Sequence, residues 1–191
     1  IEAAVMSSRL GAKTAIVTFD ENDIGTLSCN PAMGGLGKGH LIREIDAMGG
    51  VIGKASDLSG IQFRILNKTR GEAVQGPRAQ IDREKYKKNL KILLDKEEIK
   101  YLYDEVLDIV LDESKFQKKI IGLQLKSLGK VLCKSVIITT GTFLRGLIHQ
   151  GSKSWPAGRI NSKPSTNLSY FFEKHNFKLP RLKTGTPPRL L

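Results

Sequence analysis

Residues that build disulfides, metal centres and membrane spans are scarce in this 191-residue sequence. Its two cysteines, Cys29 and Cys133, form no CxxC pair, and its three histidines are too scattered to form a ligand set. No apolar run approaches the roughly 20 residues that a membrane-spanning helix needs, and no secretory signal is recognisable near the start. We therefore expect no metal site and no membrane association, and a reducing compartment.

Positive charge, in contrast, is abundant. The sequence has 31 Lys and Arg against 19 Asp and Glu, a formal net charge of +12. The segment from Arg145 to Leu191 contains nine basic residues and only one acid, Glu173. Such clustering is typical of a surface that binds nucleic-acid phosphates. A basic composition that serves only solubility is the alternative.

The first half of the sequence predicts helices that alternate with short strands. Residues 2–10 should form a helix that ends at Gly11, and residues 14–18 (TAIVT) a buried strand. Amphipathic helices are expected at 36–48 and 78–96. A helix, a turn and a buried strand form the second half of a βαβ unit, so the strand and the pyrophosphate-binding glycine turn of the first half should precede this sequence. We expect the chain to be a fragment.

The second half has the patterns of two kinds of strand. Residues 99–134 contain four strand-like runs, and Leu128-Gly129-Lys130 predicts the turn of an antiparallel hairpin. Residues 135–142 (SVIITTGT) form a continuous apolar run, typical of a strand buried on both faces of a parallel sheet. A short helix is expected at 165–175 in a loop-rich end.

This order predicts an α/β fold: a Rossmann-like FAD/NAD(P)-binding domain with an inserted mixed α+β region, truncated at both ends. Residues 51–67 are expected to be extended or irregular. The expected partial FAD-binding domain covers residues 1–191. It has parallel-sheet segments at about 1–50 and 130–150, an inserted helix and antiparallel strands at about 51–129, and a basic loop-rich segment at 151–191.

A glycine-rich segment, Ser28–Leu41 (SCNPAMGGLGKGHL), follows the first predicted strand, at the sheet edge where ligands of such folds bind. Its glycines permit positive φ and the close approach of a flat ring or a phosphate. The helix that follows would offer N–H donors, and Lys38 a positive charge. The spacing of a P-loop is absent, and a flexible linker is the alternative interpretation.

Single residues near these strand ends carry the remaining chemistry. Cys29 could be a nucleophile if the helix end and Lys38 stabilise its thiolate, or a small packed residue at a turn. Thr140-Gly141-Thr142 could hydrogen-bond a dinucleotide or simply end a strand. Asp20 and Glu21 could contact a ribose, although an exposed turn acid is the simpler interpretation.

Several long motifs together resemble one family over essentially all 191 residues: SCNPAMGGLGKGHLIREIDAMGG, GIQFRILNKTRGEAV, GPRAQIDREKY, TTGTFLRG, PAGR and RLKTGTPPR. This is the MnmG family, also called glucose-inhibited division protein A. The resemblance implies FAD-dependent addition of a carboxymethylaminomethyl or related group to carbon-5 of the wobble uridine in tRNA. It implies NADH as reductant, methylenetetrahydrofolate as one-carbon donor and an MnmE-type GTPase as partner. It also implies a homodimer within a heterotetramer, in the bacterial cytoplasm or, for a nuclear-encoded relative, the mitochondrial matrix.

The resemblance also assigns roles to individual residues. Cys29 matches the family cysteine suspected of attacking the uracil ring. The implied FAD contacts are Asn30, Pro31, Gly34, Gly35, Val106, Thr140, Gly141, Thr142 and Ser165. The implied tRNA contacts are Lys38, Arg159, Lys183 and Arg189.

The sequence departs from the family pattern at Glu72, where a proline is usual, and at Gln75, where a large or basic residue is common. GRINSKPS also lacks the acid often found before the proline. The NADH-binding insertion and the C-terminal helical region of the family are expected beyond residue 191, so a fragment of this extent should be inactive. Alternatives are a folate- and FAD-dependent tRNA uridine methyltransferase, a non-catalytic RNA-binding module and a generic flavin oxidoreductase.

Overall fold

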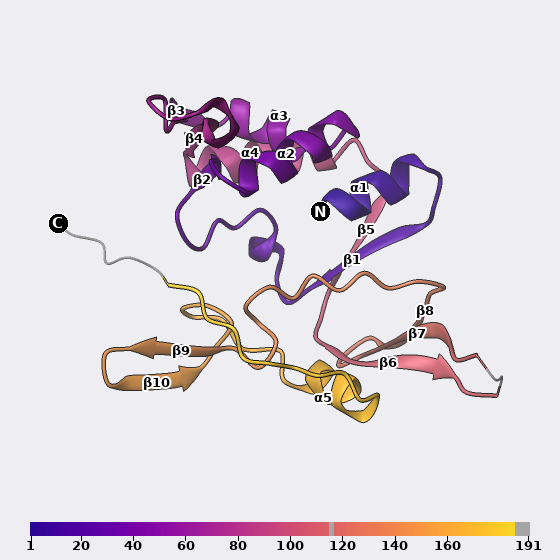
Figure 1. The fold of residues 1–191 in the computed structure, drawn as a ribbon. Coiled ribbons are helices and arrows are strands. Elements are labelled where there is room, and N and C mark those ends of the chain that lie inside the picture. Colours follow the sequence, from indigo (N-terminus) through magenta and orange to yellow (C-terminus); the bar gives the residue numbers. More distant parts are fainter. Residues whose placement is uncertain (115–116, 186–191) are drawn as a thin grey trace. The chain divides into compact units, whose positions relative to one another are not determined.

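The computed structural model describes residues 1–114 and 117–185 (Figure 1). The chain divides into two compact units, Ile1–Leu102 and Tyr103–Leu191. In the described part, no helix is both long and apolar enough to cross a membrane. The same residues contain no group of three or more His, Cys, Asp and Glu side chains placed to hold a metal ion.

The first unit combines helices with two small sheets. Strands β1 and β5 form one sheet, and β2, β4 and β3 form an antiparallel sheet in that order. The elements in chain order are α1 (Glu2–Arg9), β1 (Thr14–Thr18), η1 (Glu21–Asp23), β2 (Ala32–Gly34), α2 (Lys38–Ala47), α3 (Ile52–Asp57), β3 (Gly60–Leu66), η2 (Glu72–Val74), β4 (Gly76–Ile81), α4 (Arg83–Leu94) and β5 (Ile99–Tyr103).

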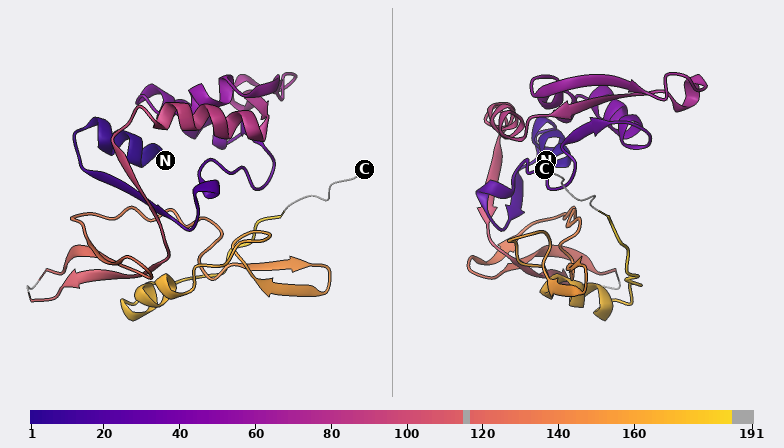
Figure 2. Two further views of the ribbon diagram at one scale, coloured as in Figure 1. Left: turned by 180° about the vertical axis from the view of Figure 1, so that it is seen from behind. Right: turned by 90° about the vertical axis from the view of Figure 1, so that its left-hand side faces the viewer.

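The core of this unit lies where its helices meet the β2–β4–β3 sheet. Helices α2, α3 and α4 lie side by side next to that sheet (Figures 1 and 2), and α2 and α3 contact its strands. Burial of apolar surface here is the main source of stability. The buried core residues are Val5, Met33, Val51, Ala55, Ala79, Ile81, Tyr86, Leu90 and Leu94.

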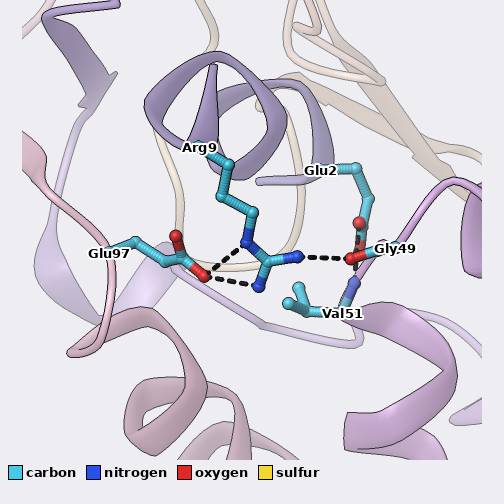
Figure 3. A network of polar contacts seen from close by, with 5 residues as sticks. All are labelled: Glu2, Arg9, Gly49, Val51 and Glu97. Carbon is cyan, nitrogen blue, oxygen red and sulfur yellow. Dashed lines mark hydrogen bonds and ion pairs between the residues drawn. The ribbon is translucent and has the colours of Figure 1, made fainter. Parts of the chain in front are cut away.

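A polar network joins three segments of the first unit (Figure 3). The Arg9 guanidinium of α1 donates to the Glu97 carboxylate, which follows α4, and to the carbonyl of Gly49, which follows α2. Beside it, the Glu2 carboxylate accepts a hydrogen bond from the backbone N–H of Val51 at 2.9 Å. The turn at the end of α2 is therefore held by both ends of α1.

The second unit contains an antiparallel meander, a hairpin and one helix. Strands β6, β7 and β8 pair in that order, β9 pairs with β10, and α5 contacts β6. The Asp104 carboxylate accepts from the backbone N–H groups of Ser127 and Leu128 and so holds the turn between β7 and β8. The elements are β6 (Val106–Asp112), β7 (Lys119–Leu125), β8 (Gly129–Leu132), β9 (Leu147–Gln150), β10 (Lys153–Pro156) and α5 (Asn167–Lys174).

The predicted antiparallel hairpin is confirmed as β7 and β8, with Gly129 at φ +71° where the turn enters β8. The buried strand predicted at 135–142 is wrong. Those residues form no strand, and Ile137 is 65% exposed. A strand of a buried sheet needs hydrogen-bonded neighbours, and no described strand pairs with this run.

Smaller differences also follow from tertiary pairing. The helix expected at 78–96 begins only at Arg83, because residues 76–81 pair with β2 and β3 and Asp82 caps the helix. Residues 51–67, expected to be extended or irregular, form the helix α3 and the extended strand β3. Strand β1 is partly rather than fully buried. The apolar face expected of α2 is only partly buried, since Leu41 and Met48 are largely exposed. The assignment of parallel-sheet and inserted segments stays a prediction.

Candidate functional site

The glycine-rich loop, Ser28–Leu41, is held by the sheet rather than free. Its centre is strand β2, and Gly34 lies opposite Arg78 of β4. Gly34 has φ +104°, and a Cβ atom there would lie 2.1 Å from the Pro77 carbonyl oxygen. The next N–H, of Gly35, donates to that same oxygen at 2.9 Å. Only glycine fits so close to another backbone segment.

The end of the loop opens into helix α2. Gly37 precedes the helix at φ +74° and provides no side-chain cap. Within the described chain, the backbone N–H groups of Leu36 and Gly37 donate no hydrogen bond, and a Cβ at Gly37 would meet nothing within 4 Å. Helix N-termini attract anions and electron-rich groups through such free donors. The space and the donors fit the ring of a flavin.

Cys29 stands at the head of the loop, exposed and outside any disulfide in the described chain. Its carbonyl accepts from Arg83 at 2.6 Å, and the carbonyl of Leu27 accepts from the Arg83 Nε at 3.0 Å. One guanidinium, from the first residue of α4, therefore positions the backbone on both sides of Ser28. Arg83 is missed by sequence reasoning because it binds carbonyl groups, which have no sequence signature.

Lys38 lies close to the cysteine but is folded back onto the loop. Its ammonium donates to the Ala32 carbonyl at 2.9 Å. Burial lowers the pKa of Lys38, and the charge of a Cys29 thiolate acts in the opposite direction. Lys38 therefore places a positive charge in the neighbourhood of the Cys29 sulfur. The loop thus combines an exposed sulfur, a positive charge and free N–H donors.

A hollow of about 310 Å³ lies in the same unit. Its lining includes Met33 and Gly34 of β2, Ile42 of α2 and Phe63 of β3, and also the charged residues Arg43, Asp57, Arg64 and Arg78. Its contact with Gly34 places it next to the glycine-rich loop.

Asp20, a candidate ribose contact in the sequence, has a structural role at its turn. Its side chain caps η1 and accepts a hydrogen bond from the Asn22 N–H.

In the second unit, the predicted turn Thr140–Thr142 and Ser165 come together. Gly141 has φ +57°, and the Thr142 hydroxyl donates to the Gly158 carbonyl at 2.8 Å. The Ser165 N–H donates to the Phe143 carbonyl at 2.8 Å, and Ser165 is buried. These bonds fix the turn and Ser165 as one backbone cluster.

Val106 lies near this cluster at the start of β6. Its neighbour Glu105 accepts from the side chain of Asn167, which begins α5 two residues after Ser165.

Of the four basic residues with an implied RNA role, Lys38 belongs to the first unit. Arg159 packs its guanidinium 5.6 Å from the centre of the Phe143 ring and donates to the Ser162 hydroxyl. Lys183 is exposed, and Arg189 lies outside the described residues.

The predicted site residues thus form two sets, one in each unit, and each set is ordered by backbone hydrogen bonds. The mixed α/β architecture, with a glycine-rich loop between a strand and a helix, places the chain in the class of Rossmann-like flavin-binding folds. Comparisons with known proteins identify the family within this class. The model of the family "Glucose inhibited division protein A" matches residues 1–191.

The chain belongs to the glucose inhibited division protein A family. It is 49% identical over 191 residues to the tRNA uridine 5-carboxymethylaminomethyl modification enzyme MnmG of Sulfurihydrogenibium sp. (strain YO3AOP1), covering all of this chain and 30% of that protein. It is 46% identical over 190 residues to the protein of the same name from Chlamydia caviae, covering 31% of it. The chain therefore spans about a third of the length of these curated relatives.

Solved structures agree with this assignment. Aquifex aeolicus GidA matches with a TM-score of 0.88 at 43% identity, over 97% of this chain and 30% of that one. A GidA-related protein from Thermus thermophilus matches with a TM-score of 0.61 at 14% identity, over 93% of this chain and 64% of that one. The second likeness concerns the fold alone. The Rossmann-like fold class expected from the sequence is confirmed.

Proposed function

We propose that this chain is part of an FAD-dependent enzyme that modifies the wobble uridine of tRNA, with Cys29 as its nucleophile. The observation that carries the proposal is the exposed Cys29 thiol beside Lys38, on a backbone held by Arg83. The family membership supports the same substrate class, since the relatives are named as tRNA uridine-modifying enzymes. The modification is proposed to be a carboxymethylaminomethyl or related group at carbon-5.

The chemistry of a thiolate suits this reaction. A sulfur that adds to carbon-6 of a uracil ring leaves an enolate, which makes carbon-5 nucleophilic. After carbon-5 has bonded to the one-carbon unit, its proton passes to a base, and breakage of the bond between carbon-6 and sulfur restores the ring double bond and the thiolate. Lys38 would stabilise the thiolate before attack. The Arg83 bonds to the carbonyls of Leu27 and Cys29 would keep the sulfur at a constant position during the reaction.

We propose as FAD contacts the loop residues Asn30, Pro31, Gly34 and Gly35. The family resemblance adds Val106, Thr140, Gly141, Thr142 and Ser165 as further proposed FAD contacts. The free N–H groups of Leu36 and Gly37 support a flavin ring at the loop. The chemistry that bound FAD would supply is transfer of a one-carbon unit from methylenetetrahydrofolate, after reduction by NADH. Lys38, Arg159, Lys183 and Arg189 are the proposed tRNA contacts.

The remaining features of the proposal rest on the family alone. They are partnership with an MnmE-type GTPase, a homodimer within a heterotetramer, and a bacterial cytoplasmic location. The relatives' name supports the first choice of reaction over the folate-dependent methyltransferase. Mass analysis of tRNA nucleosides from cells that lack the gene separates the two, because one loses the aminomethyl-type uridine and the other loses 5-methyluridine.

The decisive experiment replaces the proposed nucleophile in the full-length protein. Cys29→Ser should abolish formation of the modified wobble uridine, measured by nucleoside mass analysis, while flavin absorbance and circular dichroism stay as in the wild type. Cys133→Ser is the matched control, because Cys133 is a half-buried cysteine in the other unit. Full modification by Cys29→Ser would refute the nucleophile. A colourless wild-type protein that still binds tRNA would support the non-catalytic RNA-binding alternative instead.

A further inference from the structure

Two arginines face each other across the β3–β4 hairpin, residues 60–81. Arg64 of β3 and Arg78 of β4 are directly opposed partners in the antiparallel pairing. Opposed residues project to the same face with Cβ atoms about 5 Å apart, and like charges so placed destabilise the sheet. In the described chain no carboxylate forms an ion pair with either one. The hairpin therefore contains a repulsion that its own residues leave uncompensated.

The cross-strand neighbours of this arginine pair are polar and uncharged, and both arginines line the hollow of this unit together with Arg43 and Asp57. The next opposed pair on the same face is Gln62 and Gln80, and Arg78 has one long hydrogen bond, 3.4 Å, to Gln80. On the other side, Arg78 is opposite Gly34, where the Pro77 carbonyl excludes any side chain. Alternation puts these residues on the face away from core residues such as Met33 and Ala79. An anion can approach the two guanidinium groups from that face.

The hairpin tip, residues 67–75, adds two more cations on an ordered loop. The Gln75 side-chain amide donates to the carbonyls of Arg70, at 2.9 Å, and Lys68. The Asn67 amide donates to the carbonyl of Val74 at 2.9 Å. Lys68 and Arg70 are exposed. These polar bonds hold the loop backbone, so that both cations are presented from a fixed base.

We propose that the β3–β4 hairpin binds the phosphate backbone of the RNA substrate, with Arg64 and Arg78 on one phosphate and Lys68 and Arg70 extending the contact. A planar guanidinium matches a phosphate with two parallel hydrogen bonds, and an anion between two of them removes their repulsion. Residues 60–81 contain four basic residues against one acid, Glu72. The pairing of Arg78 with Gly34 connects this surface to the loop that begins at Cys29.

This inference rests on the proposed function, because it takes the substrate to be tRNA. The test measures binding of fluorescent tRNA to the full-length protein at several salt concentrations. Each lost phosphate contact should reduce the slope of log K against log salt by about 0.7 to 0.9, or about five- to eightfold in affinity at about 0.1 M salt. Arg64→Gln and Arg78→Gln should each show this loss. The control is Lys13→Gln combined with Lys88→Gln, two exposed lysines of the same unit outside the hairpin.

A charge reversal separates RNA binding from a structural role. Arg64→Glu places a carboxylate opposite Arg78, so it should raise the melting temperature above that of Arg64→Gln and yet weaken tRNA binding further. If Arg64 instead stabilised the fold, the reversal would lower the melting temperature. Flavin absorbance should stay unchanged in all the variants, and its loss with normal tRNA binding would assign the arginines to the cofactor and overturn the inference.

The remaining outcomes distinguish the inference from the proposed function. If the wild type binds tRNA with a steep salt dependence and the arginine variants match the lysine control, the hairpin is not the RNA surface, and the proposed function stands. If the wild type does not bind tRNA at all, both are overturned.

Discussion

The polar network around Arg9 makes a quantitative prediction about stability. The Arg9 guanidinium donates to Glu97, with Nε at 2.8 Å, and to the Gly49 carbonyl (Figure 3). The side chain of Arg9 is 38% exposed and that of Glu97 only 9% exposed. We consider the substitution Arg9→Met, which keeps most of the apolar stem and removes every one of these hydrogen bonds.

The expected loss in the free energy of unfolding of Arg9→Met has two contributions. A hydrogen bond to a charged group contributes about 1.5–3 kcal/mol, whereas a pair open to solvent contributes about 0.2–1 kcal/mol. Because Arg9 is partly exposed, we take the lower part of the first range for Glu97 and add about half a kcal/mol for Gly49. The sum is about 2 kcal/mol, and part of it reflects the carboxylate of Glu97 left without its cation in a nearly buried position.

Urea unfolding followed by far-ultraviolet circular dichroism measures this loss. With a slope of about 2 kcal/mol per M, the midpoint should fall by about 1 M urea at unchanged slope. The single tryptophan, Trp155, lies in the other unit, so its fluorescence does not report on this network directly. Backbone amide exchange at Val51 should also become faster, because the Gly49 turn loses its tether.

The control is Lys118→Met, which breaks an ion pair with Glu113 in which both side chains are more than half exposed. It should give no measurable shift of the midpoint. The double variant Arg9→Met with Glu97→Gln should recover about half of the loss, because the isolated charge is gone. A shift for Arg9→Met no larger than that of Lys118→Met, or a double variant without recovery, would show that the reasoning is wrong.

Two other predictions concern the loop and the core. Gly34→Ala should destabilise the protein by about 3 kcal/mol or more in urea unfolding, since its Cβ would meet the Pro77 carbonyl oxygen at 2.1 Å. Gly37→Ala, also at positive φ but with open space around the Cβ, should cost only about 1–2 kcal/mol in the same experiment. Burial, and secondarily Glu2, raises the pKa of Tyr86 to about 12, so the folded state retains a proton that the unfolded state loses above about pH 10. The contribution of Tyr86 to stability should therefore be constant below about pH 10 and fall by about 1.4 kcal/mol per pH unit between about pH 10 and pH 12. Urea midpoints at pH 9 and 11 should differ less in Tyr86→Phe than in the wild type, and an equal difference in both would refute the assignment.

The elements that sequence reasoning predicted well are those whose signals are local. The β7–β8 hairpin depends on alternating apolar residues and on Gly129, and helix α5 on a short apolar pattern. Each of these can be read within about ten residues. The amphipathic pattern at 78–96 likewise predicted a helix with a buried face, and Tyr86, Leu90 and Leu94 form that face of α4.

The failures arise where distant segments decide the structure. Residues 135–142 have the composition of a buried strand, but a strand forms only with hydrogen-bonded partners. Residues 78–81 fall inside a predicted helix, yet β2 and β3 pair with them from both sides. The intrinsic helix and strand propensities of single residues are weaker than such long-range pairing.

The candidate site shows the same difference between local signals and contacts of distant segments. The glycine pattern and Cys29 stand out in the sequence because glycine and a lone cysteine are distinctive residue types. Arg83 does not, since its ligands are two backbone carbonyls of a loop more than 50 positions away. The opposition of Arg64 and Arg78 depends on strand register, which the sequence alone does not specify.

The flexible-linker interpretation of the glycine-rich loop can now be rejected on physical grounds. A linker would leave its glycines free to sample many conformations. Here Gly34 is paired in a sheet, Gly35 donates to the Pro77 carbonyl, and the Gly35 carbonyl accepts from Gly39 of α2. The backbone entropy of these glycines is therefore already lost in the folded chain. Such a loop does not need to be ordered by a ligand, which is the property expected of a preorganised binding site.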